Sequence, residues 1–219
     1  MRALLTLALC AAVPAGYACA AEDEVPAAGR RAAPAAQEKP QWDFAATVYP
    51  TAVRGGNNYT SAIVAADRGA LHLEARVNYE SVGARSAFIG WTWSGGETLT
   101  WELTPIIGGA WGSVKAVVPG LEASLAWGMV DAYVEAEYVH DRDDRTGSYL
   151  YAWSELGVRP LPWLRLGLAA QRTRAYGGDR EVQRGPFAQV TWRRVTLGAY
   201  WFNPGSQEQV VVGMVGVAF

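Results

Sequence analysis

Few residues of this chain could take part in catalysis. Of the two histidines, His140 stands directly before the acidic run Asp141–Asp144, and His72 lies in a separate segment. A histidine beside a carboxylate can activate a serine for hydrolysis, but such chemistry also needs a positioned nucleophile. Neither histidine is accompanied by a nucleophile motif or a triad pattern. The sequence therefore disfavours an enzyme and predicts no catalytic residue.

The acidic segment Asp141–Thr146 could bind Ca²⁺ through its carboxylates. Arg142 and Arg145 lie in the same segment, and pairing of these arginines with the acids is the simpler account. The sequence thus predicts neither a metal site nor an organic cofactor.

The first twenty residues have the pattern of a secretory signal peptide. Arg2 precedes an apolar run from Ala3 to Val13, and Ala18-Cys19-Ala20 resembles a cleavage site. Cleavage after Ala20 would remove both cysteines, so the mature protein is expected to have no disulfide. Residues 21–41 are rich in alanine, are interrupted by proline and have no hydrophobic period, so we expect a disordered periplasmic segment. With 19 Lys and Arg against 21 Asp and Glu, no nucleic-acid partner is expected.

Residues 42–219 have the alternation of β-strands. From Ala70 to Glu80, apolar and polar residues alternate at every position, which is the period of a strand with two different faces. We predict an all-β fold, a transmembrane antiparallel up-and-down β-barrel of about 12 strands, with 10 or 8 as alternatives. The predicted strands are 42–51, 57–66, 69–81, 84–95, 98–109, 115–128, 131–141, 147–158, 162–173, 184–193, 194–203 and 208–219.

The predicted connections alternate between tight turns and longer polar loops. Arg193-Arg194 is an example of a turn, and Asp141–Gly147 and Ala175–Arg184 are examples of loops. The short connection around Ser81–Gly83 is the exception. Bacterial outer-membrane barrels have this asymmetry, with short periplasmic turns and longer outward loops.

Aromatic residues decide between a membrane barrel and a soluble lipocalin-type barrel, because both share the alternation. In the predicted topology, six tryptophans of different strands fall at the periplasmic strand ends, where Phe219 also lies. Tyr79, Tyr138 and Trp201 fall at the outer ends. Two aromatic belts are expected of a membrane-spanning barrel. The predicted periplasmic girdle is Trp42, Trp93, Trp101, Trp127, Trp163, Trp192 and Phe219.

The last segment, Gln209–Phe219, ends on an aromatic residue, with Val217, Val215 and Val211 on the same face. In this pattern the chain resembles the Gram-negative outer-membrane β-barrel proteins, whose final strand ends in Phe. The resemblance implies a location in the bacterial outer membrane. It also implies that the barrel assembly machinery reads the terminal strand.

The alternation assigns ten ionisable side chains to the lumen, with acids in excess. Buried carboxylates are costly unless they are hydrated or paired, so this lumen must be wet, hydrogen-bonded, or both. An open, acidic lumen would favour cations, whereas Glu–Arg pairs such as Glu74 with Arg76 would close it. The predicted lumen residues are His72, Glu74, Arg76, Glu80, Glu102, Glu122, Glu135, Glu137, Glu155 and Arg165.

Arg172 and Arg174 share a parity that directs them outward at the outer rim, and Arg85 is assigned to the same rim. Arginine suits phosphate groups, so these residues are candidates for contact with lipopolysaccharide. The alternative is that the strand has ended or bulged before Arg172.

We therefore expect a monomeric barrel in contact with outer-membrane lipid and lipopolysaccharide. The leading function is a small porin-like channel for small solutes or cations. A plugged structural or surface-interaction barrel is the second possibility. A lipid-modifying or proteolytic barrel enzyme is the third.

Overall fold

The computed structural model describes residues 40–175 and 180–219. The signal peptide and most of the segment predicted to be disordered lie outside these residues. Within them the only helix is the single 3₁₀ turn Arg145–Gly147, and all other regular structure is β. No helix in this part of the chain is long and apolar enough to cross a membrane.

Twelve antiparallel strands close into a barrel, and a short thirteenth extends one of them, as predicted for the fold. β4 and β5 are the two parts of one predicted strand, interrupted at Thr92. The strands are β1 (Asp43–Val53), β2 (Tyr59–Arg68), β3 (Leu71–Val77), β4 (Ala84–Trp91), β5 (Trp93–Gly95), β6 (Leu99–Gly112), β7 (Ala116–Trp127), β8 (Val130–Asp141), β9 (Tyr149–Leu161), β10 (Leu164–Ala175), β11 (Arg180–Trp192), β12 (Val195–Phe202) and β13 (Val210–Ala218).

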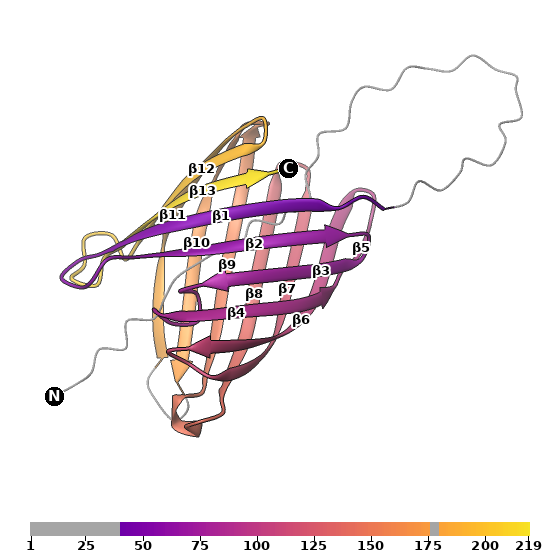
Figure 1. Ribbon diagram of the computed structural model, residues 1–219. Coiled ribbons are helices and arrows are strands. Elements are labelled where there is room, and N and C mark those ends of the chain that lie inside the picture. Colours follow the sequence, from indigo (N-terminus) through magenta and orange to yellow (C-terminus); the bar gives the residue numbers. More distant parts are fainter. Residues whose placement is uncertain (1–39, 176–179) are drawn as a thin grey trace, which may run out of the picture.

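Each strand pairs with its neighbours in sequence, and β1 closes the ring by pairing with β13 (Figure 1). Phe44 and Phe219 exchange backbone hydrogen bonds at this seam, and their rings stack. Closure satisfies every strand edge, which a β-structure in lipid requires because the bilayer core offers no water.

The connections differ between the two ends of the barrel. At one end the strands are joined by two or three residues, for example Gly69–Ala70, Gly128–Met129 and Arg193–Arg194. Gly69 and Gly128 have φ of 60° and 58°, a left-handed conformation that suits glycine in tight turns. At the other end most connections are longer, including 142–148 and 203–209.

The connection from β3 to β4 corrects the sequence prediction. We expected a strand to Ser81 and a short turn, with Tyr79 in the outer aromatic belt, but β3 ends at Val77. Asn78 is left-handed, with φ of 56°, and this breaks the alternation. As a result Tyr79 and Glu80 are both buried inside the barrel, and the prediction for Tyr79 was wrong.

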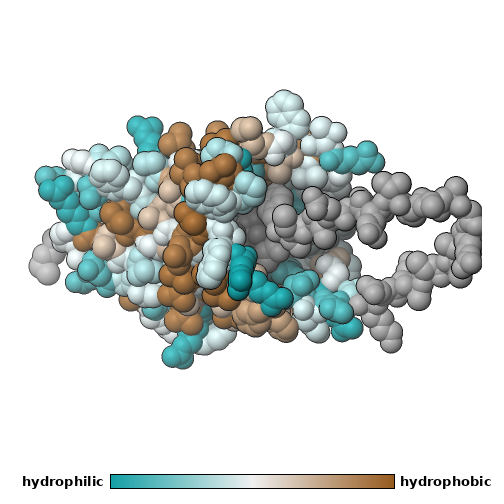
Figure 2. All heavy atoms as spheres, turned by 90° about the horizontal axis from the view of Figure 1, so that it is seen from above, coloured by the Kyte–Doolittle hydropathy of each residue, from teal (hydrophilic) through white to brown (hydrophobic). Residues whose placement is uncertain are grey.

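The outer face is apolar and the inner face is polar. Large aliphatic side chains in mid-strand, such as Leu168, Leu156 and Ile107, are more than half exposed on the outside, whereas charged residues of the same strands are buried inside. In Figure 2, brown side chains gather across the middle of the visible face, and most teal ones lie toward its ends. A soluble lipocalin-type barrel has the opposite arrangement, so the structure contradicts that alternative.

Candidate functional site: the barrel lumen

The structure places all ten predicted lumen residues on the inner face. Eight are buried, and Glu102 and Glu122 are half-buried. Nine of them lie on strands, where the alternation directs them inward. Glu80 instead reaches the interior through the inward fold of the β3–β4 connection.

Arg76 is the centre of the first group, which we call the Arg76 cluster. Its guanidinium is fully buried and pairs with Glu74 of the same strand at 2.7 Å. It also crosses the lumen to β8, where it lies 2.6 Å from Glu137 and 3.3 Å from Glu135, and it is 3.7 Å from Glu122 of β7. Since β3 and β8 are four strands apart around the ring, these ion pairs span the interior.

Aromatic side chains support the Arg76 cluster. The guanidinium carbon lies 4.2 Å from the ring centre of Tyr79 and 4.3 Å from that of Phe88. Tyr79 donates a hydrogen bond to Glu135, and Tyr133 donates a second one at 3.3 Å. Across the lumen on β9, Tyr149 donates to the backbone carbonyl of Glu80.

Arg165 of β10 is the centre of a second group, the Arg165 cluster. The guanidinium binds Asp131 of β8 through two nitrogens and Glu155 of β9 through a third. The same nitrogen that binds Glu155 also donates to the Gln189 side-chain oxygen at 3.2 Å. Tyr200 donates to Glu155 at 2.7 Å and accepts from Gln189 at 2.7 Å.

The two clusters share a construction. Phe88 lies opposite Gly108 in the register of β4 and β6, and Phe187 lies opposite Gly167 in the register of β11 and β10. In each pair the ring covers the glycine, because a Cβ on the glycine would lie 2.3 Å from Phe88 and 2.7 Å from Phe187. The two arginines then stack over these two rings. Glycine thus gives the aromatic ring room to lie against the barrel wall.

The clusters differ in how completely their polar atoms are paired. In the Arg165 cluster every side chain named above has a hydrogen-bond partner. In and beside the Arg76 cluster, buried atoms lack one: Glu74 Oε1, Glu122 Oε1, His72 Nε2, Arg76 Nε and both carboxylate oxygens of Glu80. Four carboxylates also share one guanidinium. The Arg76 cluster therefore has an excess of negative charge and unused ligand atoms.

The sequence analysis missed the residues that complete these clusters. Asp131 stands at the inner-face parity of Tyr133, Glu135 and Glu137, so the same alternation could have found it. Phe88, Phe187 and Tyr200 read as generic apolar positions. Tyr79 had no signal, because the left-handed Asn78 that redirects it is visible only in the backbone.

The seven predicted girdle residues are all exposed on the outside at the barrel end that has the tight turns. Their exposed fractions run from 39% for Trp42 to 71% for Trp192. Trp91 lies at the same end and was not in the predicted set. At the opposite end Tyr138, Trp201 and Trp111 are exposed. Aromatic side chains thus mark both rims of the apolar band.

The predicted lipopolysaccharide residues do not form one site. Arg85 begins the exposed face of β4, and β10, which carries Arg172, lies five strands away around the ring. β10 remains paired to Ala175, so the strand has neither ended nor bulged at Arg172; its irregularity lies at Leu164–Leu166. The side chain of Arg174 lies outside the described part of the chain. Contact with lipopolysaccharide stays a prediction.

The acidic β8–β9 connection is organised by internal hydrogen bonds. Asp141 accepts from the backbone nitrogens of Asp143 and Asp144, and Asp143 pairs with Lys115 at 2.9 Å. Asp144 accepts from Thr146, and these hydrogen bonds lower the pKa of its carboxyl. The expected internal pairing is present, but its described partners are Lys115 and backbone groups instead of the arginines.

Comparisons with known proteins give a structural match and no sequence match. No family model matches the chain, and neither does any curated protein. Two solved structures are similar. The KdgM porin has a TM-score of 0.58 at 10% identity, and the KdgM porin in complex with disordered oligogalacturonate has 0.57 at 9%. Each match covers 80% of this chain and 98% of the other. The fold of this chain is therefore that of a small outer-membrane porin barrel.

Proposed function

We propose that this protein is an outer-membrane channel for small solutes, with a preference for cations, and not an enzyme. The observation that carries the proposal is a closed 12-strand barrel with a charged inner face and an apolar outer face. A barrel of this size is wider than the eight-strand barrels that side chains fill, and narrower than the general porins. Similarity to a porin supports the proposal.

The outer membrane is the location that best fits this surface. Exposed aliphatic residues in mid-strand and aromatic residues at both ends match a hydrocarbon core and its two interfaces. A signal peptide at residues 1–20 would export the chain.

The lumen charge argues for cations. The two clusters contain six carboxylates and two guanidiniums, and Glu102 and Glu80 add to the acidic side. A ring of carboxylates attracts cations and repels anions. The similar porin is described in complex with oligogalacturonate, an oligosaccharide with a carboxylate on each sugar. An acidic lumen opposes such a polyanion, so we propose different solutes for this chain.

The path is narrow. Ion pairs from β3 reach β8, and Trp153 of β9 packs edge-on against Tyr200 and Phe202 of β12. These contacts shorten the open cross-section in two directions. We therefore propose passage of ions and small solutes.

Conductance of single barrels refolded into a planar bilayer tests the proposal. We expect steady, small steps whose reversal potential in a salt gradient shows cation preference. Glu102→Gln should reduce that preference, because Glu102 is a half-buried lumen acid outside the ion pairs of Arg76 and Arg165. Glu208→Gln, in an exposed loop, is the matched control and should change nothing. A folded barrel that is electrically silent or anion-selective would overturn the proposal.

A further inference from the structure

The polar atoms without partners in and beside the Arg76 cluster point to a ligand. We propose that His72, Glu74 and Glu122 form a binding site for a divalent transition-metal ion of the zinc type. His72 and Glu74 lie two residues apart on β3, and Glu122 lies on β7. This inference rests on the geometry of these side chains, and it does not require that the barrel conducts.

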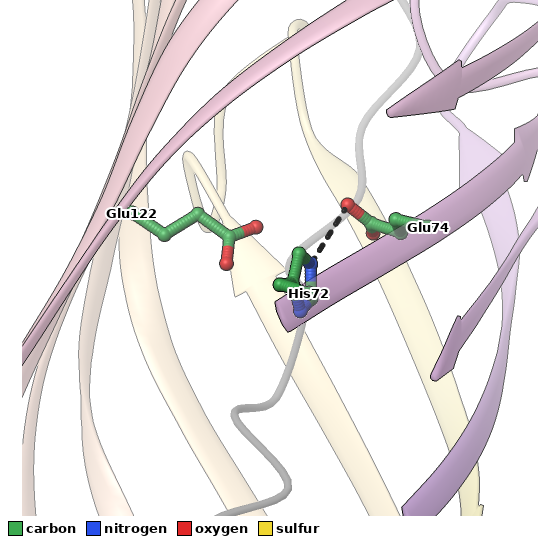
Figure 3. Close-up of side chains that lie close together, drawn as sticks. All are labelled: His72, Glu74 and Glu122. Atoms are coloured by element: carbon green, nitrogen blue, oxygen red, sulfur yellow. Dashed lines mark ion pairs between the residues drawn. The ribbon is translucent and has the colours of Figure 1, made fainter. Parts of the chain in front are cut away.

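The three side chains converge on one point inside the barrel. One ligand atom from each lies within 4.8 Å of the others. In Figure 3 the carboxylate of Glu122 points across to the ring of His72, and Glu74 lies on the other side of that ring. Bonds of about 2.0–2.2 Å to a tetrahedral zinc ion put ligand atoms about 3.4 Å apart. Rotation of the half-buried Glu122 side chain can make this adjustment.

The second observation is that each residue offers a buried atom without a hydrogen-bond partner. These atoms are His72 Nε2, Glu74 Oε1 and Glu122 Oε1. Residues 72 and 74 are 9% and 4% exposed. A buried polar atom without a partner costs free energy of about 1–3 kcal/mol, and more when it is charged. A cation at this point would satisfy all three atoms.

Asp67 prepares His72 for this role. The Nδ1 atom of His72 lies 2.7 Å from the Asp67 carboxylate. When Nδ1 carries the proton in this contact, the lone pair of Nε2 faces Glu74 and Glu122. A carboxylate that holds the distal nitrogen of a ligand histidine is the usual outer-shell arrangement at zinc sites.

The ligand set and the charge select the metal class. One imidazole and two carboxylates, with water as a fourth ligand, suit zinc and similar ions, whereas Ca²⁺ and Mg²⁺ prefer oxygen alone. Glu74 and Glu122 belong to the group of four carboxylates around Arg76. A divalent ion would offset the negative charge that one guanidinium leaves.

Zinc binding by the refolded full chain in detergent tests this site. All samples carry Cys10→Ser and Cys19→Ser, which remove the competing thiols, and are stripped with EDTA before titration with Zn²⁺ alone. We expect one ion per chain by equilibrium dialysis. We also expect intense visible bands with Co²⁺, as for a tetrahedral site.

Four variants locate the metal. His72→Gln and Glu122→Gln should each weaken binding at least tenfold, and Asp67→Asn by about 10–100-fold. His140→Gln removes the other histidine, which stacks on Tyr138 at the opposite end of β8, and should change affinity less than twofold. Heat-modifiable migration confirms folding, and Glu122→Gln still tests the site if His72→Gln fails to fold. No saturable binding, or binding that His72→Gln and Glu122→Gln leave intact, would overturn the site.

Discussion

Arg76 holds together side chains from three strands, and its removal should be costly. Arg76→Gln leaves the buried acids of β3, β7 and β8 without their guanidinium. Breaking a buried ion pair on one side costs about 3–5 kcal/mol. We expect a loss of this size in the free energy of unfolding, measured by urea titration of the refolded barrel.

Lys115→Gln is the matched control for Arg76→Gln. Lys115 pairs with a single acid, Asp143, and both side chains are more than 60% exposed. Exposed pairs contribute about 0–1 kcal/mol. Equal effects of the two substitutions would contradict the stabilising role of Arg76.

The hydroxyl of Thr146 sets the acidity of a neighbouring carboxyl. Its hydrogen bonds hold the pKa of Asp144 below the usual value. A lowered pKa gives stability that is present above the unfolded-state pKa and is lost as pH falls through the folded-state value. Thr146→Val should return this pKa toward its ordinary value, which NMR titration of the carboxyl carbon can measure. An unchanged pKa would show that the backbone contact alone is responsible.

Between strands, the glycine that faces Phe88 should tolerate no side chain. A Cβ on Gly108 of β6 would lie 2.3 Å from the Phe88 ring and 2.5 Å from the backbone oxygen of Ala87 on β4. Gly108→Ala must therefore move Phe88, on which Arg76 stacks. Overpacking costs about 1–3 kcal/mol, and we expect this loss in urea unfolding.

Gly109 provides the control for this prediction on the same strand. A Cβ there meets nothing closer than the Ala116 backbone oxygen at 3.9 Å. Gly109→Ala should be neutral or slightly stabilising, because alanine restricts the unfolded chain. If both alanines behave alike, the aromatic ring does not need the glycine.

For the whole molecule, the apolar band should tolerate no charge. Leu168 is 64% exposed in the middle of β10. Leu168→Arg should destabilise the barrel by about 2–4 kcal/mol if it lies near the bilayer midplane, as measured by unfolding from lipid vesicles. Ser206→Arg, in the β12–β13 connection, should be neutral. A tolerated Leu168→Arg would contradict the proposed membrane position.

The C-terminal Phe219 offers a test of assembly. Phe219→Ala keeps the backbone pairing with Phe44 but removes the stacked ring. If the assembly machinery reads this residue, the fraction of folded barrel in cells should fall several-fold while refolding in detergent changes little. Trp192→Ala, an exposed girdle residue of β11, is the control. Equal losses in both settings would assign the ring to barrel closure alone.

Alternation alone determined the strand number, the antiparallel order and the two faces, because a period of two admits no other placement once one face must meet lipid. It also directed the ten ionisable residues inward. Which of them touch was decided by closure of the barrel, which brings Arg76 of β3 to Glu135 and Glu137 of β8. Local pattern carries no information about partners four strands away. Likewise only the backbone at Asn78 turned Tyr79 inward, and only the ring of strands brought Glu122 to His72 and Glu74.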